Sequence, residues 1–374
     1  MRRDPWFDNA KMGLVTLVVL GHAWVLLPST TFVGHGYDFL YAWHVPAFVF
    51  VTGYLSRSFT YERRRMWQLV RTVAVPYVVF EAAIAAFRIL VGNEQLEDLW
   101  RDPHWPMWYL AALFFWRLLT PVFTPLWGGV AIAVAVAASL VAGLYAGDTL
   151  DVARVLGLLP FFVMGLKATP ENLERLRARW VQVCAVGVFV AIWLVTARLD
   201  DWAATEWLYY RARYDELDVS DTQAFLTRAG LLVIGTLGAW AFLALVPRVG
   251  GWFTRMGAAT LVVYLFHGFF VKGADYAGFP AWAEGHYGLS ILLTTVAALG
   301  LSLLLAWQPV ASRLQHLVDP VGYAERRVDH AHELRDAALE TDVLAEAVQD
   351  AAEAAAVSTA GSTAGSTAGP ASRG

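Results

Sequence analysis

A series of about ten long apolar segments most constrains what this chain can fold into, because roughly 17 to 25 apolar residues form a helix that crosses a bilayer. Hydrophobic residues make up 57% of the sequence and charged residues only 16%, which is more apolar surface than a soluble domain can bury. The sequence therefore predicts an all-α polytopic membrane protein. The expected transmembrane helices are at 12–28, 37–56, 72–91, 105–120, 128–146, 152–168 (interrupted by Pro160), 180–198, 224–246, 256–272 and 288–307.

Basic residues fall in alternate loops between these segments. The positive-inside rule places such loops in the cytoplasm. The opposite loops are mostly acidic, with Arg211 and Arg213 as exceptions. We therefore expect a multi-pass protein of the plasma (inner) membrane with both termini cytoplasmic. The basic residues on the predicted inner side are Arg57, Arg63, Arg64, Arg65, Arg71, Lys167, Arg175, Arg177, Arg179, Arg248 and Arg255 in the loops, with Arg2, Arg3 and Arg313 towards the ends.

The rest of the composition excludes several classes of protein. Cys184 is the single cysteine, so neither an intrachain disulfide nor a zinc-type cysteine cluster is available. Residues 2–28 could be read as a signal peptide, but His22 interrupts the apolar run and no A-x-A-like cleavage site follows. We expect contact with membrane lipid and no nucleic-acid partner.

The composition changes towards the C-terminus. We expect a transmembrane domain over 1–318, a cytoplasmic amphipathic helical segment over 319–357, and a disordered tail of STAG repeats over 358–374. The helical segment has apolar residues at helical spacing, whereas the tail has almost nothing to bury. Neither segment is assigned a catalytic role.

Ionisable residues at the edge of the first span and inside it need an explanation, because a charge within hydrocarbon costs a few kcal/mol. Asp8, Lys11 and His22 lie on one helical stripe, and Lys11 and His22 are separated by about 16 Å along the axis. This places Lys11 at the inner headgroups and His22 near the middle of the bilayer. Asp8 could pair with Lys11 or be a solvated residue at the helix start. Lys11 alone could also reach lipid phosphates, and His22 alone could bond a neighbouring helix.

Two further histidines fall inside predicted spans. His44 follows the start of the second span, and Pro46 breaks the helical hydrogen-bond pattern beside it. His267 lies in the ninth span. Three imidazoles without cysteine or closely spaced carboxylate partners favour acid–base and polar cavity groups over a metal site, so no metal is expected. Glu81, inside the third span, is assigned no role.

These residues sit in motifs that resemble acyltransferase family 3, in particular its branch similar to fucose 4-O-acetylase. Lys11 and His22 stand at the spacing of the family's signature of a basic residue, ten residues and a histidine. The resemblance spans roughly residues 2–310. Lys11 replaces the arginine of many members, Trp43 replaces Phe, and Thr52 replaces Ser. The remaining matches are WHVP at 43–46, TGY at 52–54, RTVAVPY at 71–77, PMWYLAALFFWR at 106–117, LPFFVMGL at 159–166 and ATLVVYLFHGFF at 259–270.

The resemblance implies a CoA-dependent O-acetyltransferase that moves an acetyl group from cytoplasmic acetyl-CoA to a hydroxyl of a cell-envelope or lipid-linked glycan. His22 would be the general base, and His44 is the alternative candidate for that role. Asp8 would pair with Lys11 and keep its ammonium group in place. The expected donor-binding residues are Lys11, Arg64, Arg65 and Arg71, and Arg71 is the better of the arginines because it heads a family-like motif.

The expected acceptor-binding residues are Trp105, Trp108, Tyr109 and His267. The three aromatic residues could instead belong to an interfacial aromatic belt. A secondary transporter or lipid-linked glycan exporter with a polar central cavity is an alternative function, but the two halves of the chain show no internal repeat. A non-catalytic scaffold would gain nothing from buried histidines.

Overall fold

The computed structural model describes residues 4–96, 102–147, 149–217 and 219–325, and most residues between 327 and 348. The chain divides into two compact units, Met1–Asp319 and Pro320–Gly374. The described residues of the second unit are helical. The predicted STAG-repeat tail lies outside the described residues, as do Arg2 and Arg3.

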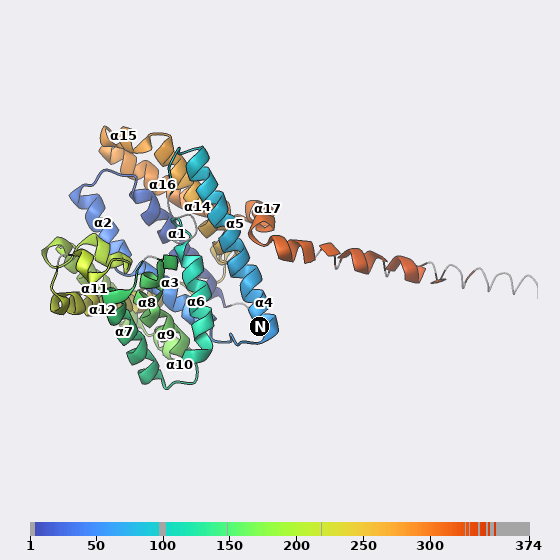
Figure 1. The fold of residues 1–374 in the computed structure, drawn as a ribbon, viewed down its shortest axis with the longest axis horizontal. Helices are drawn as coiled ribbons and strands as arrows, with labels where there is room; N and C mark the ends of the chain where they lie inside the picture. The colour runs from blue at the N-terminus through green and yellow to red at the C-terminus, as the bar shows by residue number, and fades with distance from the viewer. Residues whose placement is uncertain are drawn as a thin grey trace, which may run out of the picture. The chain divides into compact units, whose positions relative to one another are not determined.

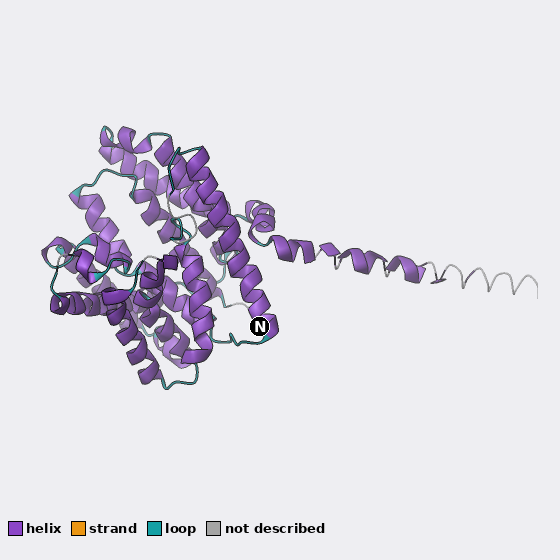
Figure 2. Cartoon of the chain, viewed as in Figure 1, coloured by secondary structure: helices purple, strands orange, loops and turns teal. Residues whose placement is uncertain are grey.

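Every regular element among the described residues is a helix (Figures 1 and 2). The main helices of the first unit are α1 (Pro5–Trp24), α2 (Thr31–Tyr41), α3 (His44–Leu55), α4 (Arg63–Leu69), η1 (Val70–Ala74), α5 (Val75–Leu90), α6 (Trp108–Phe123), α7 (Gly128–Tyr145), α8 (Val152–Gly157), α9 (Leu159–Lys167), α11 (Arg179–Thr196), α12 (Asp221–Leu245), α14 (Thr260–Tyr276), α16 (Tyr287–Ala306) and α17 (Gln308–Val318). The short connecting helices are α10 (Pro170–Arg175), α13 (Trp252–Met256), α15 (Phe279–Glu284), η2 (Thr149–Asp151), η3 (Leu199–Asp201), η4 (Thr205–Tyr209) and η5 (Tyr214–Leu217).

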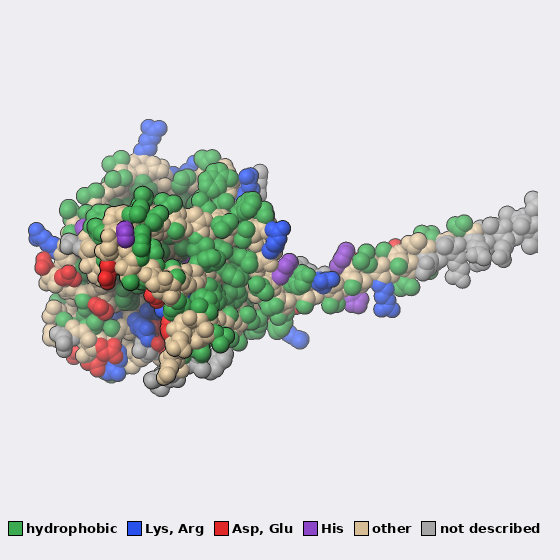
Figure 3. Space-filling view, turned by 90° about the horizontal axis from the view of Figure 1, so that it is seen from above, with side chains coloured by type: hydrophobic (Ala, Val, Ile, Leu, Met, Phe, Trp, Pro, Cys, Tyr) green, Lys and Arg blue, Asp and Glu red, His purple; other side chains and the backbone are tan. Residues whose placement is uncertain are grey.

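Five helical stretches in the described residues are long and apolar enough to cross a membrane: Arg63–Leu90, α7, α11, α12 and α16. The bent pair of α8 and α9 would make a sixth. Figure 3 shows hydrophobic side chains over much of the visible surface, as a lipid-facing protein requires. The other four predicted runs are also helical, but they are shorter, broken or more polar. The all-helical fold is thus confirmed, whereas the total of about ten spans stays a prediction.

Helix α1 lies at the centre of the first unit, packed against α2, α3, α14 and α16 (Figure 1). Its first turn is capped by Asp4, whose side chain accepts a hydrogen bond from the backbone N–H of Trp6 at 2.9 Å, and Pro5 fits the first helical position. The helix therefore begins seven residues before the predicted span. His22 lies in its last turn. Its expected depth near the middle of the bilayer stays a prediction.

The second predicted run is broken in two. Helix α2 ends at Tyr41 and α3 begins at His44, three residues after it. Pro46 lies in the first turn of α3, where the N–H that it lacks would have no partner within the helix. The predicted break beside Pro46 is confirmed, and it makes His44 the first residue of a new helix.

Two glycines allow α3 and α9 to cross in close contact. A Cβ atom on Gly53 would lie 2.0 Å from the backbone oxygen of Phe162, and a Cβ on Gly165 would lie 2.0 Å from that of Phe50. Small residues are the usual means by which membrane helices approach this closely. Helix α9 is in turn bent by 54° from the preceding helical turns at Leu158, just before Pro160. Helix α8, before the bend, packs against α6 and α7, whereas α9, after it, packs against α3.

Candidate functional site

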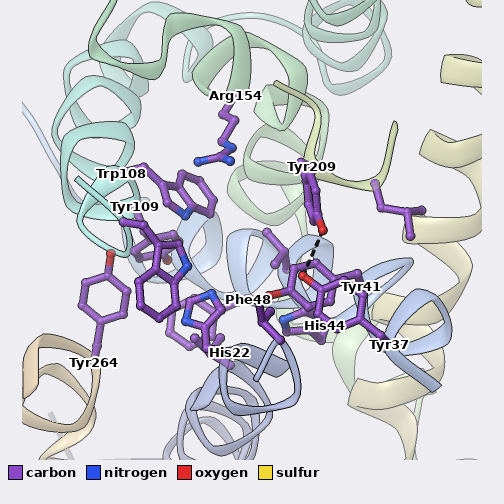
Figure 4. Close-up of a pocket in the computed structure, with 15 residues that line it drawn as sticks. His22, Tyr37, Tyr41, His44, Phe48, Trp108, Tyr109, Arg154, Tyr209 and Tyr264 are labelled. Atoms are coloured by element: carbon purple, nitrogen blue, oxygen red, sulfur yellow. Dashed lines mark hydrogen bonds between the residues drawn. The ribbon is translucent and has the colours of Figure 1, made fainter. Parts of the chain in front are cut away.

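A cavity of about 260 Å³ opens among residues of α1, α2, α3, α6, α8, α14 and η4 (Figure 4). Its lining includes the imidazoles of His22 and His44 and the guanidinium of Arg154, and its walls are otherwise mainly aromatic. This volume is just below the roughly 300–1,000 Å³ that is typical of small-molecule pockets. The aromatic lining residues are Tyr37, Tyr41, Phe48, Trp105, Trp108, Tyr109, Tyr209 and Tyr264.

The last turn of α1 brings His22 to this cavity. The Nδ1 atom of His22 is 2.8 Å from Nε2 of His267 on α14, within hydrogen-bond distance. The ring of Trp105 packs on His22 with centroids 4.5 Å apart. His267 itself is 0% exposed and is not part of the cavity lining, so it contacts His22 rather than occupying the acceptor side where it was predicted.

The break between α2 and α3 turns His44 towards the same cavity (Figure 4). Its Nδ1 atom donates a hydrogen bond to the backbone oxygen of Leu40 at 2.7 Å, and its ring meets the ring of Tyr41 edge-on. His44 is almost fully buried. The two candidate bases, His22 and His44, therefore line one cavity from two different helices.

Arg154 forms part of the wall that faces the histidines (Figure 4). Its Nη1 atom lies 3.0 Å from a carboxylate oxygen of Asp151, and its guanidinium carbon lies 4.9 Å from the centre of the Trp108 ring. Beside it, the hydroxyl groups of Tyr37 and Tyr209 are 3.0 Å apart. This wall combines a paired cation with phenol groups that can exchange hydrogen bonds with a hydroxylated substrate.

The three aromatic residues predicted to bind the acceptor all line the cavity. The segment that carries Trp105 is tied down by Glu81, which is 1% exposed on α5. A carboxylate oxygen of Glu81 accepts hydrogen bonds from the backbone N–H of His104 at 2.7 Å and from Nδ1 of His104 at 2.5 Å. The hydroxyl of Tyr264 donates to the backbone oxygen of Pro106. Glu81 thus has a structural contact that the sequence did not suggest.

Lys11 and Asp8 form an ion pair with 2.8 Å between Nζ and Oδ1, so of the two readings of Asp8 the structure has the paired one. Neither residue lines the cavity. Lys11 is only 24% exposed, because the surrounding helices cover this part of α1. The pair is therefore a separate feature on the helix that also carries His22.

The predicted donor-binding arginines also lie away from the cavity. Arg64 lies in a shallow open hollow on α4, and Arg65 is 3.7 Å from Glu62. Arg71 sits in η1, with its Nε atom 3.7 Å from Asp319. The structure brings together the predicted histidines and aromatic residues, but it does not bring the basic residues to the same place.

Sequence reasoning identified Tyr109 but missed Arg154 and the other tyrosines of the cavity, which are Tyr37, Tyr41, Tyr209 and Tyr264. Arg154 lies inside the predicted span 152–168, where a basic residue is costly and could have been noticed on that ground. Tyr264 lies one helical turn before His267 and so shares its face of α14. Tyr37 and Tyr209 carry no local signal, because the packing of η4 against α2 brings them together.

Comparison with known proteins decides the family. The profile of a family described as an acyltransferase domain matches residues 4–307. The chain belongs to acyltransferase family 3. Nodulation protein NolL of Mesorhizobium japonicum (strain LMG 29417 / CECT 9101 / MAFF 303099) is similar, with 25% identity over 362 residues that cover 87% of this chain and 90% of that protein. No solved structure matches the chain significantly.

Membership of acyltransferase family 3 confirms the resemblance that the motifs predicted. The matched region runs from the residue that caps α1 to the end of α16, so it includes every residue that lines the cavity. The chain is a membrane acyltransferase of this family. Within the described residues, no three His, Cys, Asp or Glu side chains are grouped as metal ligands would be.

Proposed function

We propose that this acyltransferase moves an acetyl group from cytoplasmic acetyl-CoA to a hydroxyl of a cell-envelope or lipid-linked glycan. The observation that carries the proposal is the cavity in which two imidazoles face aromatic walls inside the family domain. Imidazole is suited to removing the proton of an attacking hydroxyl near neutral pH. Aromatic rings and phenol groups are suited to the faces and hydroxyls of a sugar.

In the proposed reaction His22 is the general base. The acceptor oxygen attacks the thioester carbonyl carbon, and the hydroxyl proton passes to the ring nitrogen of His22 that does not face His267. The carbon–sulfur bond then breaks, and the proton returns to the CoA sulfur, giving free CoA and an O-acetyl ester. His44 lines the same cavity and is the second candidate for the base.

The donor would enter from the cytoplasmic side. Lys11, held by Asp8 at 2.8 Å, and Arg71 would bind phosphates of CoA, with Arg64 and Arg65 extending the basic surface. Lys11 and His22 are about 16 Å apart along α1. The long pantetheine arm of CoA suits this separation, because it carries phosphates at one end and the thioester at the other.

The acceptor would enter from the opposite side. In the predicted topology, the segments that carry Trp105, Arg154 and Tyr209 all lie near the outer surface. Trp105, Trp108 and Tyr109 would contact the sugar, since they line the cavity beside His22. His267 leaves the acceptor set, because its fully buried ring contacts His22 instead.

The test is the release of free CoA from acetyl-CoA by the purified full-length protein, followed by transfer of labelled acetyl groups to a panel of envelope glycans. We expect CoA release that increases with one class of glycan. The His22→Gln variant, purified at the same level, is the control and should release little CoA. A folded wild-type protein that moves a glycan across vesicles without releasing CoA would support an exporter and contradict the proposal.

A further inference from the structure

The buried imidazole of His267 makes two hydrogen bonds that together determine where its proton lies. Its Nδ1 atom is 2.6 Å from the backbone oxygen of Tyr264, and its Nε2 atom is 2.8 Å from Nδ1 of His22. The two imidazole rings lie nearly parallel, with an angle of 16° between their planes and 5.1 Å between their centroids. The Tyr264 oxygen, as a carbonyl, can only accept a hydrogen bond.

A proton must therefore sit on Nδ1 of His267. Neither His267 nor His22 has a carboxylate partner among the described residues, and a fully buried imidazolium without a counter-charge is costly. His267 is thus neutral, and a neutral imidazole with Nδ1 protonated has only a lone pair at Nε2. That lone pair must accept the hydrogen bond from Nδ1–H of His22.

We infer that His267 is a positioning residue that holds His22 in the tautomer with Nδ1 protonated and Nε2 free to accept a proton. The inference rests on the proposed role of His22 as base and deepens it. In serine hydrolases a carboxylate beside the catalytic histidine sets the tautomer and the orientation of the ring. Here a neutral imidazole takes that place, and the Tyr264 backbone sets the tautomer of His267 in turn.

Packing around the pair supports this fixed arrangement. The centroid of the Trp105 ring lies 4.5 Å from that of the His22 ring and 6.1 Å from that of the His267 ring. A Cβ on Gly268, the next residue of α14, would come within 2.8 Å of Pro106, so this turn of the helix packs directly against the segment that carries Trp105. The His267 ring therefore has little freedom to turn away from His22.

The experiment uses full-length protein with ¹⁵N-labelled histidine rings, whose nitrogen resonances distinguish protonated from unprotonated positions. The His22 signals are identified by their loss in His22→Gln. We expect Nδ1 protonated and Nε2 unprotonated in the wild type.

His267→Gln offers an amide oxygen in place of Nε2 and should keep this tautomer. His267→Phe removes the acceptor and should populate the other tautomer. Tyr264→Phe, which keeps the backbone carbonyl, should leave the His22 tautomer unchanged.

Kinetics give the second readout. His267→Phe should lower kcat about 100-fold or more without a matching rise in KM for acetyl-CoA, whereas His267→Gln should restore most of the turnover. Protonated Nε2 on His22 in the wild-type spectrum would overturn the inference, and so would an unchanged tautomer in His267→Phe. The spectra do not depend on activity. The predicted tautomer in a protein that does not release CoA would therefore contradict only the proposed function.

Discussion

His22 and His44 line the same cavity, but only His22 contacts a second imidazole, and this difference separates their expected roles. His22→Gln should lower kcat by about 10²- to 10⁴-fold, the usual contribution of a positioned acid–base group, while KM for acetyl-CoA changes little. The measurement compares turnover and KM for His22→Gln and His44→Gln in membranes with equal protein levels. Near-normal turnover in His22→Gln with none in His44→Gln would move the base to α3.

Lys11 should act on donor binding rather than on the chemical step. Its ion pair with Asp8 holds the ammonium group in one place, and a positive charge there would attract CoA phosphates. Lys11→Ala should raise KM for acetyl-CoA far more than KM for the acceptor, and Lys11→Arg should keep most activity. Equal losses in both variants, at equal levels of inserted protein, would show that charge alone is not the requirement.

Among the elements, the segment between α5 and α6 depends on Glu81. Its carboxylate holds the backbone and side chain of His104, next to Trp105. Glu81→Leu removes the oxygen that accepts both hydrogen bonds and leaves the His104 donors unpaired, which should cost roughly 1–3 kcal/mol of stability. We expect a lower Tm in detergent and a higher KM for the acceptor. Glu81→Gln keeps one oxygen acceptor and should be affected less. A Tm equal to that of the wild type in Glu81→Leu would contradict this role.

Another contact, beyond the end of α5, links this helix to α14. Burial raises the pKa of the Glu94 carboxyl, but hydrogen bonds from Tyr276, Arg88 and Lys272 outweigh it and lower that pKa to about 2. The carboxylate of Glu94 thus stabilises the folded state above its ordinary pKa of 4.5, and this contribution is lost as pH falls towards 2. The Tm of the wild type should exceed that of Glu94→Gln at neutral pH, and the difference should shrink over this acidic window. Parallel Tm curves would contradict the prediction.

At the scale of the whole molecule, the apolar runs predict where the helices lie, because each run is a local property of the sequence. The start of α1 at Pro5 could not be predicted from an apolar run, because its first residues are partly polar. Asn9 is polar, yet its side chain donates to the backbone oxygen of Pro247 at 2.7 Å, a contact 238 residues away. The make-up of the cavity could not be predicted from local sequence either. Arg154 lines it, and His267 contacts His22 beside it, because helices that are distant in the sequence pack together. Residue type suggested the histidines, whereas only the fold pairs His22 with His267.

The alternating loop charges also make a prediction about the whole chain. Reporters fused after residues 95 and 210 should lie on the outer side of the membrane. Reporters fused after residue 172 and at the C-terminus should lie on the cytoplasmic side. The measurement is reporter activity that depends on compartment, with equal expression of each fusion as the control. A C-terminal reporter on the outside would contradict the predicted topology.

Helix α1 carries Lys11 near its start and His22 in its last turn, so one rigid element sets both their separation and their relative direction. Inserting a single residue between them would turn one end by about 100° relative to the other and lengthen the helix by about 1.5 Å. A substitution on α1 changes one side chain, but an insertion or deletion changes the register of the two ends. Natural variation in the length of this protein should therefore fall in its loops and tail, and the eleven-residue step within α1 should stay constant.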